Sequence, residues 1–133
     1  MTLFRIALIL VSLFGYQAFA QDNESVAQPQ LSIQQSKYVD FKGSNVSISN
    51  ETTVFEGKFI VLGEGVYGHF DMVAFDDSGK VLQKAMSEDR AWRRDQGSKL
   101  KTLTLSVNEA YPSKVDVSFH EMRVNSDIGA CKQ

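Results

Sequence analysis

The chain has 133 residues, with 14 Lys and Arg against 16 Asp and Glu, two His and one Cys, and a formal net charge of −2. A mildly acidic chain lacks the basic surface that nucleic acids and anionic membranes attract, so we expect neither as a partner. A single cysteine leaves no internal disulfide, and stability must come from burial and strand pairing. The length suits one domain with its own core.

Residues 1–20 predict a signal peptide. Arg5 precedes an apolar run from Ile6 to Phe14, and the segment ends in Ala18-Phe19-Ala20, the small-x-small pattern of a cleavage site. A retained membrane anchor is the alternative, but a spanning helix needs about 20 apolar residues and this run is shorter. We therefore expect a bacterial periplasmic or secreted protein, without stable membrane insertion after cleavage.

The rest of the chain predicts an all-β domain. Residues 21–30 are polar and contain a proline, which is typical of a flexible leader, and 126–133 form a flexible tail. Between them, residues 31–125 alternate short strand-like runs with turn signals. The strand candidates are 31–41, 46–49, 58–63, 69–76, 80–85, 99–107 and 114–124. About seven such strands favour a single antiparallel, immunoglobulin-like β-sandwich.

Two connections carry local signals of their own. Residues 76–79, Asp-Asp-Ser-Gly, predict a type I hairpin turn in which Gly79 adopts a positive φ. Residues 87–95 predict at most one short helical turn, because Ser87 can cap it, acidic residues follow in its first turn and arginines come near its end.

Strand alternation indicates which residues of the last strand face the core. One face carries Val115, Val117 and Phe119, which we assign to the core. The opposite face, which we expect to point outward, carries Asp116, Ser118, His120 and Met122.

The strand at 69–76 allows two orientations. Either Phe70 and Met72 are core and His69 and Asp71 point outward, or Val73 and Phe75 are core and Met72 faces out. The first is favoured because it keeps the charge of Asp71 out of the interior, where an unpaired carboxylate is costly. In an immunoglobulin-like order this strand and the last one can be neighbours, which would bring opposed side chains to within about 5–8 Å.

These orientations suggest a metal site built from His69, His120 and Met122, with Asp71 or Met72 as a further ligand. Imidazole with thioether suits copper, Cu(I) above all, whereas imidazole with carboxylate suits zinc or Cu(II). His120 and Met122 lie at i and i+2, on one face of their strand. Copper is our first expectation and zinc the second. The alternative is two solvated histidines on strand faces, with Met72 as core filler.

A second candidate site surrounds Trp92, the only tryptophan, which Arg90, Arg93 and Arg94 flank. An exposed aromatic ring among guanidinium groups binds sugars, anions or an acidic partner surface. The alternative is that Trp92 packs into one end of the sandwich while the arginines pair with the acidic residues beside them.

No motif of an enzyme is present. The sequence contains no Gly-x-Ser-x-Gly, no His-Glu-x-x-His, no cysteine beside a Gly-rich turn and no phosphate-binding loop. His120-Glu121 alone is not a metalloprotease motif. We therefore expect a protein without catalytic residues.

Residues 68–124 carry a resemblance. The run "GHFDMVAFDDSGKVL", an arginine-rich crossing and the closing "VDVSFHEMRV" are similar to small exported β-sandwich proteins of Gram-negative bacteria. The residues that carry it are Gly68, His69, Asp77, Gly79, Val81, Leu82, Arg90, Arg94 and His120. The resemblance implies a β-sandwich of the bacterial envelope and a role for the two histidines.

The sequence thus predicts an exported, non-catalytic binding or accessory protein of the envelope with a surface copper or zinc site. The alternative is a protein-interaction module that contacts an envelope partner through an edge strand or the Trp92 loop. The two hypotheses differ in a structural requirement: the first needs His69 and His120 in one coordination sphere, the second an exposed Trp92 or an unprotected edge.

Overall fold

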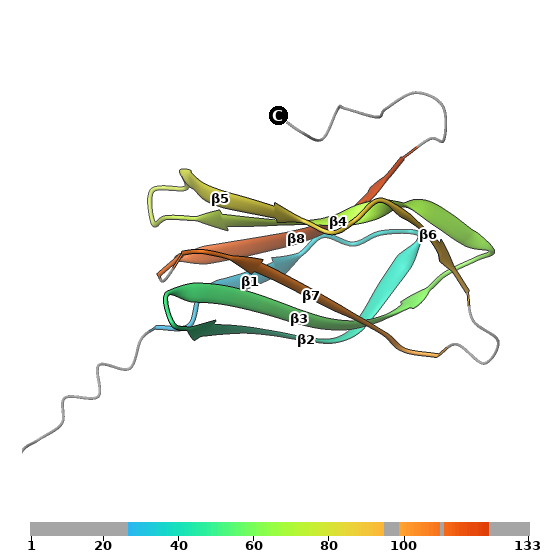
Figure 1. Ribbon diagram of the computed structural model, residues 1–133, viewed down its shortest axis with the longest axis horizontal. Coiled ribbons are helices and arrows are strands. Elements are labelled where there is room, and N and C mark those ends of the chain that lie inside the picture. Colours follow the sequence, from blue (N-terminus) through green and yellow to red (C-terminus); the bar gives the residue numbers. More distant parts are fainter. Residues whose placement is uncertain (1–26, 95–98, 110, 123–133) are drawn as a thin grey trace, which may run out of the picture.

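Eight strands form the domain in a computed structural model that describes residues 27–94, 99–109 and 111–122 (Figure 1). No helix occurs among these residues. The strands are β1 (Gln30–Ile33), β2 (Val39–Ser49), β3 (Thr52–Val61), β4 (Gly65–Phe75), β5 (Val81–Met86), β6 (Arg90–Arg93), β7 (Lys101–Val107) and β8 (Lys114–Glu121).

The strands lie in two sheets packed face to face, so the predicted β-sandwich is confirmed. The larger sheet has the order β1-β8-β4-β5, with β6 also paired to β4, and the smaller has the order β2-β3-β7. All pairs are antiparallel except β1 and β8, which run parallel. The expectation of a purely antiparallel fold was therefore wrong at this one edge.

Aromatic side chains from both sheets meet in the core. Phe59 of β3 and Phe70 of β4 are fully buried, and their ring centroids lie 4.9 Å apart in an edge-to-face arrangement. Met72 is also fully buried, which confirms the preferred orientation of β4. Val115 and Val117 of β8 are buried as predicted, and Phe119 is partly buried against the same cluster. Full burial of one such side chain contributes about 1.5–3 kcal/mol.

The predicted turn between β4 and β5 is confirmed. The Gly79 amide donates a hydrogen bond to the Asp76 carbonyl, and Gly79 has a φ of 82°. The Asp76 carboxylate accepts hydrogen bonds from the Ser78 amide, the Ser78 hydroxyl and the Lys80 amide. These bonds stabilise the charged form and lower the pKa of Asp76 from its ordinary value of 3.8, the Ser78 hydroxyl having the largest effect.

The first half of the domain differs from the predicted strands. Residues 31–41 are not one strand, because β1 and β2 are separated by 34–38 and belong to different sheets. β2 continues through the predicted loop at 42–44 by means of a bulge after Phe41. A two-residue turn with positive φ at Asn50 (48°) and Glu51 (61°) then leads into β3, as in type I′ hairpins. The count is therefore eight strands rather than seven.

Strands β5 and β6 occupy the same edge of β4, separated by a three-residue bulge. β5 pairs with Asp71–Phe75 and β6 with Gly65–Gly68, so residues 87–89 lie opposite only His69 and Phe70. Ser87 maintains the ladder across this interruption: its amide donates to the Phe70 carbonyl, and its hydroxyl accepts from the Phe70 amide, both at 2.9 Å.

The helical turn expected near 87–95 is not formed, since Arg90–Arg93 is strand β6. An isolated helix of one or two turns is marginal in water. The strand conformation instead pairs this segment with β4 and buries Trp92 between Phe59 and Phe70, at centroid distances of 5.4 and 5.3 Å. Tertiary packing therefore outweighs the local helix signals.

The predicted signal peptide (1–20), C-terminal tail (126–133) and Cys131 lie outside the described residues, as does most of the predicted leader. Within the described part of the chain, no helix is long and apolar enough to cross a membrane.

Candidate metal centre

The two histidines of the sequence face each other across neighbouring strands. β4 and β8 pair in antiparallel register with His69 directly opposite His120, and Asp71 is opposite Ser118. The expected adjacency of these strands is thereby confirmed. The ring centroids of the two imidazoles lie 5.2 Å apart, within the range expected for opposed side chains. Asp71 shares the face of His69 because it is two residues further along β4.

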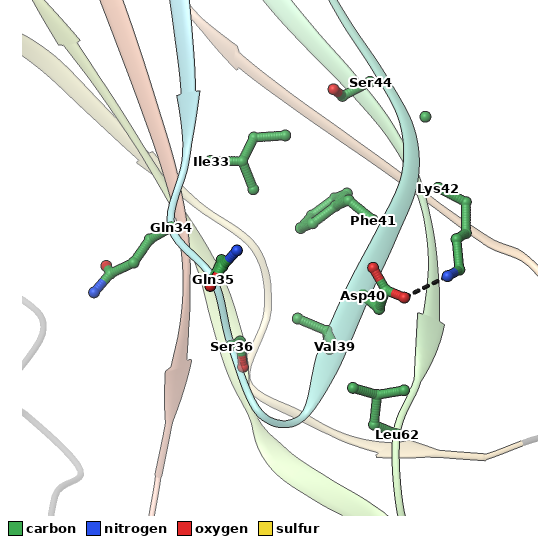
Figure 2. A pocket seen from close by; sticks show the side chains of 11 residues that line it. Ile33, Gln34, Gln35, Ser36, Val39, Asp40, Phe41, Lys42, Ser44 and Leu62 are labelled. Carbon is green, nitrogen blue, oxygen red and sulfur yellow. Dashed lines mark hydrogen bonds and ion pairs between the residues drawn. The ribbon is translucent and has the colours of Figure 1, made fainter.

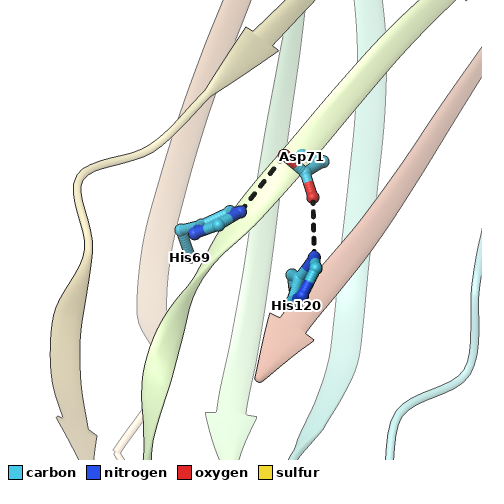
Figure 3. Close-up of side chains that lie close together, drawn as sticks. All are labelled: His69, Asp71 and His120. Carbon is cyan, nitrogen blue, oxygen red and sulfur yellow. Dashed lines mark ion pairs between the residues drawn. The ribbon is translucent and has the colours of Figure 1, made fainter. Parts of the chain in front are cut away.

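Asp71 lies between the two imidazoles (Figure 3). Its Oδ1 is 3.4 Å from His69 Nε2, and its Oδ2 is 3.9 Å from His120 Nδ1. Taking one ligand atom from each of the three residues, all of these atoms lie within 4.8 Å of one another. We call this group, His69, Asp71 and His120, the β4–β8 cluster. Its two imidazoles and one carboxylate are all metal ligands.

His69 lies on the outward face of β4, as predicted, but it is not solvated. Only 1 % of its side chain is exposed. The interpretation of both histidines as solvated surface residues was therefore wrong for His69. The reason is the bulge between β5 and β6: it carries Asp89 over the ring, and Asp89 Oδ1 lies 2.7 Å from His69 Nδ1.

The contact with Asp89 determines which ring nitrogen of His69 carries a proton. An ionised carboxylate only accepts hydrogen bonds, so Nδ1 must be the donor in this short contact. In the neutral ring, Nε2 then presents a lone pair. This Nε2 is buried and has no hydrogen-bond partner, although it faces Asp71 Oδ1 at ion-pair distance. Two electron-pair donors face each other there, an arrangement that a cation between them would stabilise.

The arrangement matches a recurrent feature of metal sites. A histidine that binds a metal through one nitrogen commonly donates the other ring N–H to a carboxylate, which fixes the tautomer and raises the basicity of the ligand. In this protein Asp89 occupies the place of that carboxylate, and Nε2 of His69 is directed at the other members of the β4–β8 cluster.

The spacing is close to that of four-coordinate zinc. With metal–ligand bonds of about 2.0–2.1 Å, tetrahedral ligands lie about 3.3 Å from one another. The 3.4 Å between His69 and Asp71 already meets this value, whereas the 3.9 Å between Asp71 and His120 exceeds it. A small rotation of the His120 side chain, which is 45 % exposed, would close the difference.

The local charge favours a divalent ion. Asp71 and Asp89 place two carboxylates on either side of the neutral His69 ring, and their side chains are 27 % and 39 % exposed. Charges of one sign, partly removed from water, raise the local concentration of ions of the opposite sign. One Zn²⁺ or Cu²⁺ would neutralise both.

Two of the predicted sulfur ligands lie elsewhere than expected. Met72 is in the core, on the opposite face of β4 from the cluster. Met122 follows the end of β8, and its amide donates to the Tyr67 carbonyl. Met122 is buried, with 6 % of its surface exposed, so the expectation that it points into solvent was wrong.

The tryptophan site is not the exposed platform that a ligand-binding role requires. Trp92 is 5 % exposed, and its indole Nε1 donates a 3.0 Å hydrogen bond to the Gly68 carbonyl. This bears out the alternative interpretation, in which the ring packs into the sandwich. Arg90 covers the ring from outside, with its guanidinium carbon 4.1 Å from the ring centroid, while Arg93 and Arg94 are exposed.

A separate hollow of about 510 Å³ lies where β1 and β2 diverge into different sheets (Figure 2). Its lining combines apolar side chains such as Ile33 and Phe41 with polar Gln34 and Gln35. The two charged residues in the lining, Asp40 and Lys42, form an ion pair with each other. The hollow therefore presents a nearly neutral lining, unlike the anionic surroundings of His69.

Asp89 is the site residue that the sequence analysis missed. It was assigned to the first turn of a helix, and its position over His69 depends on a bulge formed by two distant strand pairings. The other three residues of the centre were identified from strand alternation. No protein-family model, no curated protein and no solved structure matches the chain, so its function must be argued from its own residues.

Proposed function

We propose that this protein is an exported, non-catalytic metal-binding protein of the bacterial envelope, and that its β4–β8 cluster holds one zinc or copper ion. The observation that carries the proposal is the buried Nε2 of His69, which has no hydrogen-bond partner and is directed at Asp71 and His120. A buried polar atom without a partner costs about 1–3 kcal/mol, and coordination of an ion would recover this energy.

The set of donors argues for a borderline divalent ion. Two imidazoles and one carboxylate suit Zn²⁺ and Cu²⁺, whereas Mg²⁺ and Ca²⁺ prefer all-oxygen sites. Cu(I), the first expectation from the sequence, would need a soft ligand, and the thioether of Met122 is the sulfur closest along the strand to His120. A Met122→Leu variant separates these cases: it should weaken Cu(I) binding if the thioether is a ligand and leave Zn²⁺ binding unchanged.

The envelope location rests on the predicted signal peptide and on the resemblance of residues 68–124 to exported β-sandwich proteins. Metal ligands must be deprotonated, so an ion competes with protons for the imidazole nitrogens. We therefore expect binding to weaken as the pH falls below about 6.5, the ordinary pKa of histidine.

The test is a titration of the protein without residues 1–20 by isothermal calorimetry, with Zn²⁺, Cu²⁺ and anaerobic Cu(I). A Cys131→Ser background removes the one thiol that could bind the same metals. We expect one equivalent to bind with submicromolar affinity, and the His69→Ala/His120→Ala double variant to lose it. Glu56→Gln, an exposed acidic residue on β3 in the other sheet, is the control and should bind as the wild type does. Equal binding by the double variant would refute the proposal.

A further inference from the structure

The three residues of the β4–β8 cluster differ in their contact with solvent. The exposed fraction of the side chain is 1 % for His69, 27 % for Asp71 and 45 % for His120. The cluster is therefore closed on the side of β4 that Asp89 covers and open on the side of His120, near the end of β8. An ion bound by all three would be reached from solvent past His120.

The described residues of the cluster supply three ligand atoms. Zinc in proteins is four-coordinate in structural sites, whereas three protein ligands with a water or an external ligand in the fourth position mark a site that reacts or exchanges. The surplus position would lie on the side where solvent enters, because the buried side is already filled by the His69 ring and its contact with Asp89.

The two histidines are also held differently. His69 is fixed by burial and by the 2.7 Å contact of its Nδ1 with Asp89. His120 is fixed through its backbone: β4 and β8 approach so closely that a Cβ at Gly68 would lie 2.1 Å from the His120 carbonyl oxygen. Its imidazole, in contrast, is nearly half exposed and can rotate without disturbing the sheet.

From these differences we infer that the ion is passed on by ligand substitution from the His120 side, to an acceptor protein that supplies an imidazole nitrogen. This inference rests on the proposed function. The incoming nitrogen donates its lone pair to the ion at the open position, and the bond between the ion and His120 then breaks. The electron pair of that bond remains on His120, so the charge of the ion does not change and no oxidant or reductant is needed. His69 is the last ligand to leave.

The first test uses the Co²⁺-substituted protein, whose visible absorption reports on the ligands, and free imidazole as the probe of the open position. We expect a saturable spectral change on addition of imidazole. The Glu56→Gln control should respond as the wild type does. A Co²⁺ spectrum that imidazole leaves unchanged while the ion stays bound would mean a closed coordination sphere and would overturn the inference.

The second test measures the rate at which the chromogenic chelator 4-(2-pyridylazo)resorcinol removes Zn²⁺ from the loaded protein. Substitution at an open position predicts a rate that rises in proportion to the chelator concentration. His120→Ala should accelerate the transfer by about tenfold or more, because affinity differences between related complexes appear mainly in dissociation. Asp71→Asn, a variant of the less exposed carboxylate, gives a second comparison should His120→Ala bind too weakly to load.

The outcomes separate the two proposals. Tight binding with a transfer rate that does not depend on chelator concentration would overturn the inference and leave the metal site standing. Failure of the wild type to bind any of the ions would overturn both.

Discussion

The contact between Asp89 and His69 gives the sharpest prediction, because no sequence motif points to it. Replacing Asp89 with alanine should weaken Zn²⁺ binding without removing any metal ligand. The carboxylate lies 2.7 Å from His69 Nδ1, the length of a charge-assisted hydrogen bond. Loss of such a carboxylate behind a ligand typically lowers metal affinity about 10–100-fold, equivalent to about 1.4–2.8 kcal/mol.

Exposure of Asp89 decides where in this range the effect should fall. Its side chain is 39 % exposed, so in the variant a water molecule can reach Nδ1 and replace part of the lost interaction. We therefore expect a loss close to tenfold for Asp89→Ala. Asp89→Asn keeps an acceptor oxygen but removes the charge, and its loss should be smaller.

The assay is competition for Zn²⁺ against a chelator of known affinity, with Glu88→Ala as the matched control. Glu88 is exposed, belongs to the same bulge and carries the same charge. Side-chain ¹H–¹⁵N correlation spectra should also show His69 with its proton on Nδ1 in the wild type. If Asp89→Ala and Glu88→Ala bind Zn²⁺ equally well, the argument that Asp89 orients a metal ligand is wrong.

Three further predictions concern the stability of the fold. Gly79→Val should lower the free energy of unfolding in urea by about 1–2 kcal/mol, because valine must adopt a left-handed conformation there; unchanged stability would show that the turn rearranges freely. Asp76 has a lowered pKa in the folded state, so its stabilising effect is present above its ordinary value of 3.8 and is lost as the pH falls through the folded value. The difference in unfolding free energy between wild type and Asp76→Asn should therefore be constant near neutral pH and shrink in acid; a difference that stays constant down to pH 2 would contradict this. Trp92→Ala should cost about 3–5 kcal/mol, as expected for a buried aromatic residue, and a loss below 1 kcal/mol by urea unfolding would contradict the packing of this ring against Phe59 and Phe70.

Features that depend on short-range rules were predictable from the sequence. Alternation along the strand assigned Phe70 and Met72 to the core and placed His69 and Asp71 together on the other face. The Asp-Asp-Ser-Gly turn was recognised because Gly79 supplies a positive φ that few residues adopt readily. The β2–β3 hairpin was missed for the converse reason, since Asn50-Glu51 lacks the glycine that usually marks such a turn.

Features that depend on what covers a strand were not predictable in this way. Alternation gives the direction of a side chain, but the burial of His69 comes from Asp89, twenty residues further along the chain. The same holds for residues 87–95, whose charges suggested a helix until pairing with β4 and burial of Trp92 were included. In both cases a contact between distant parts of the chain outweighs the local pattern.

The central claim is that one ion binds between His69, Asp71 and His120, and the most direct test is a crystal structure of the protein grown with Zn²⁺, with data collected on both sides of the zinc absorption edge. The account predicts one anomalous peak about 2.0–2.1 Å from His69 Nε2 and from a ring nitrogen of His120, with an Asp71 oxygen at a similar distance. Zinc bound at any other place, with His69 Nε2 still without a ligand, would contradict it.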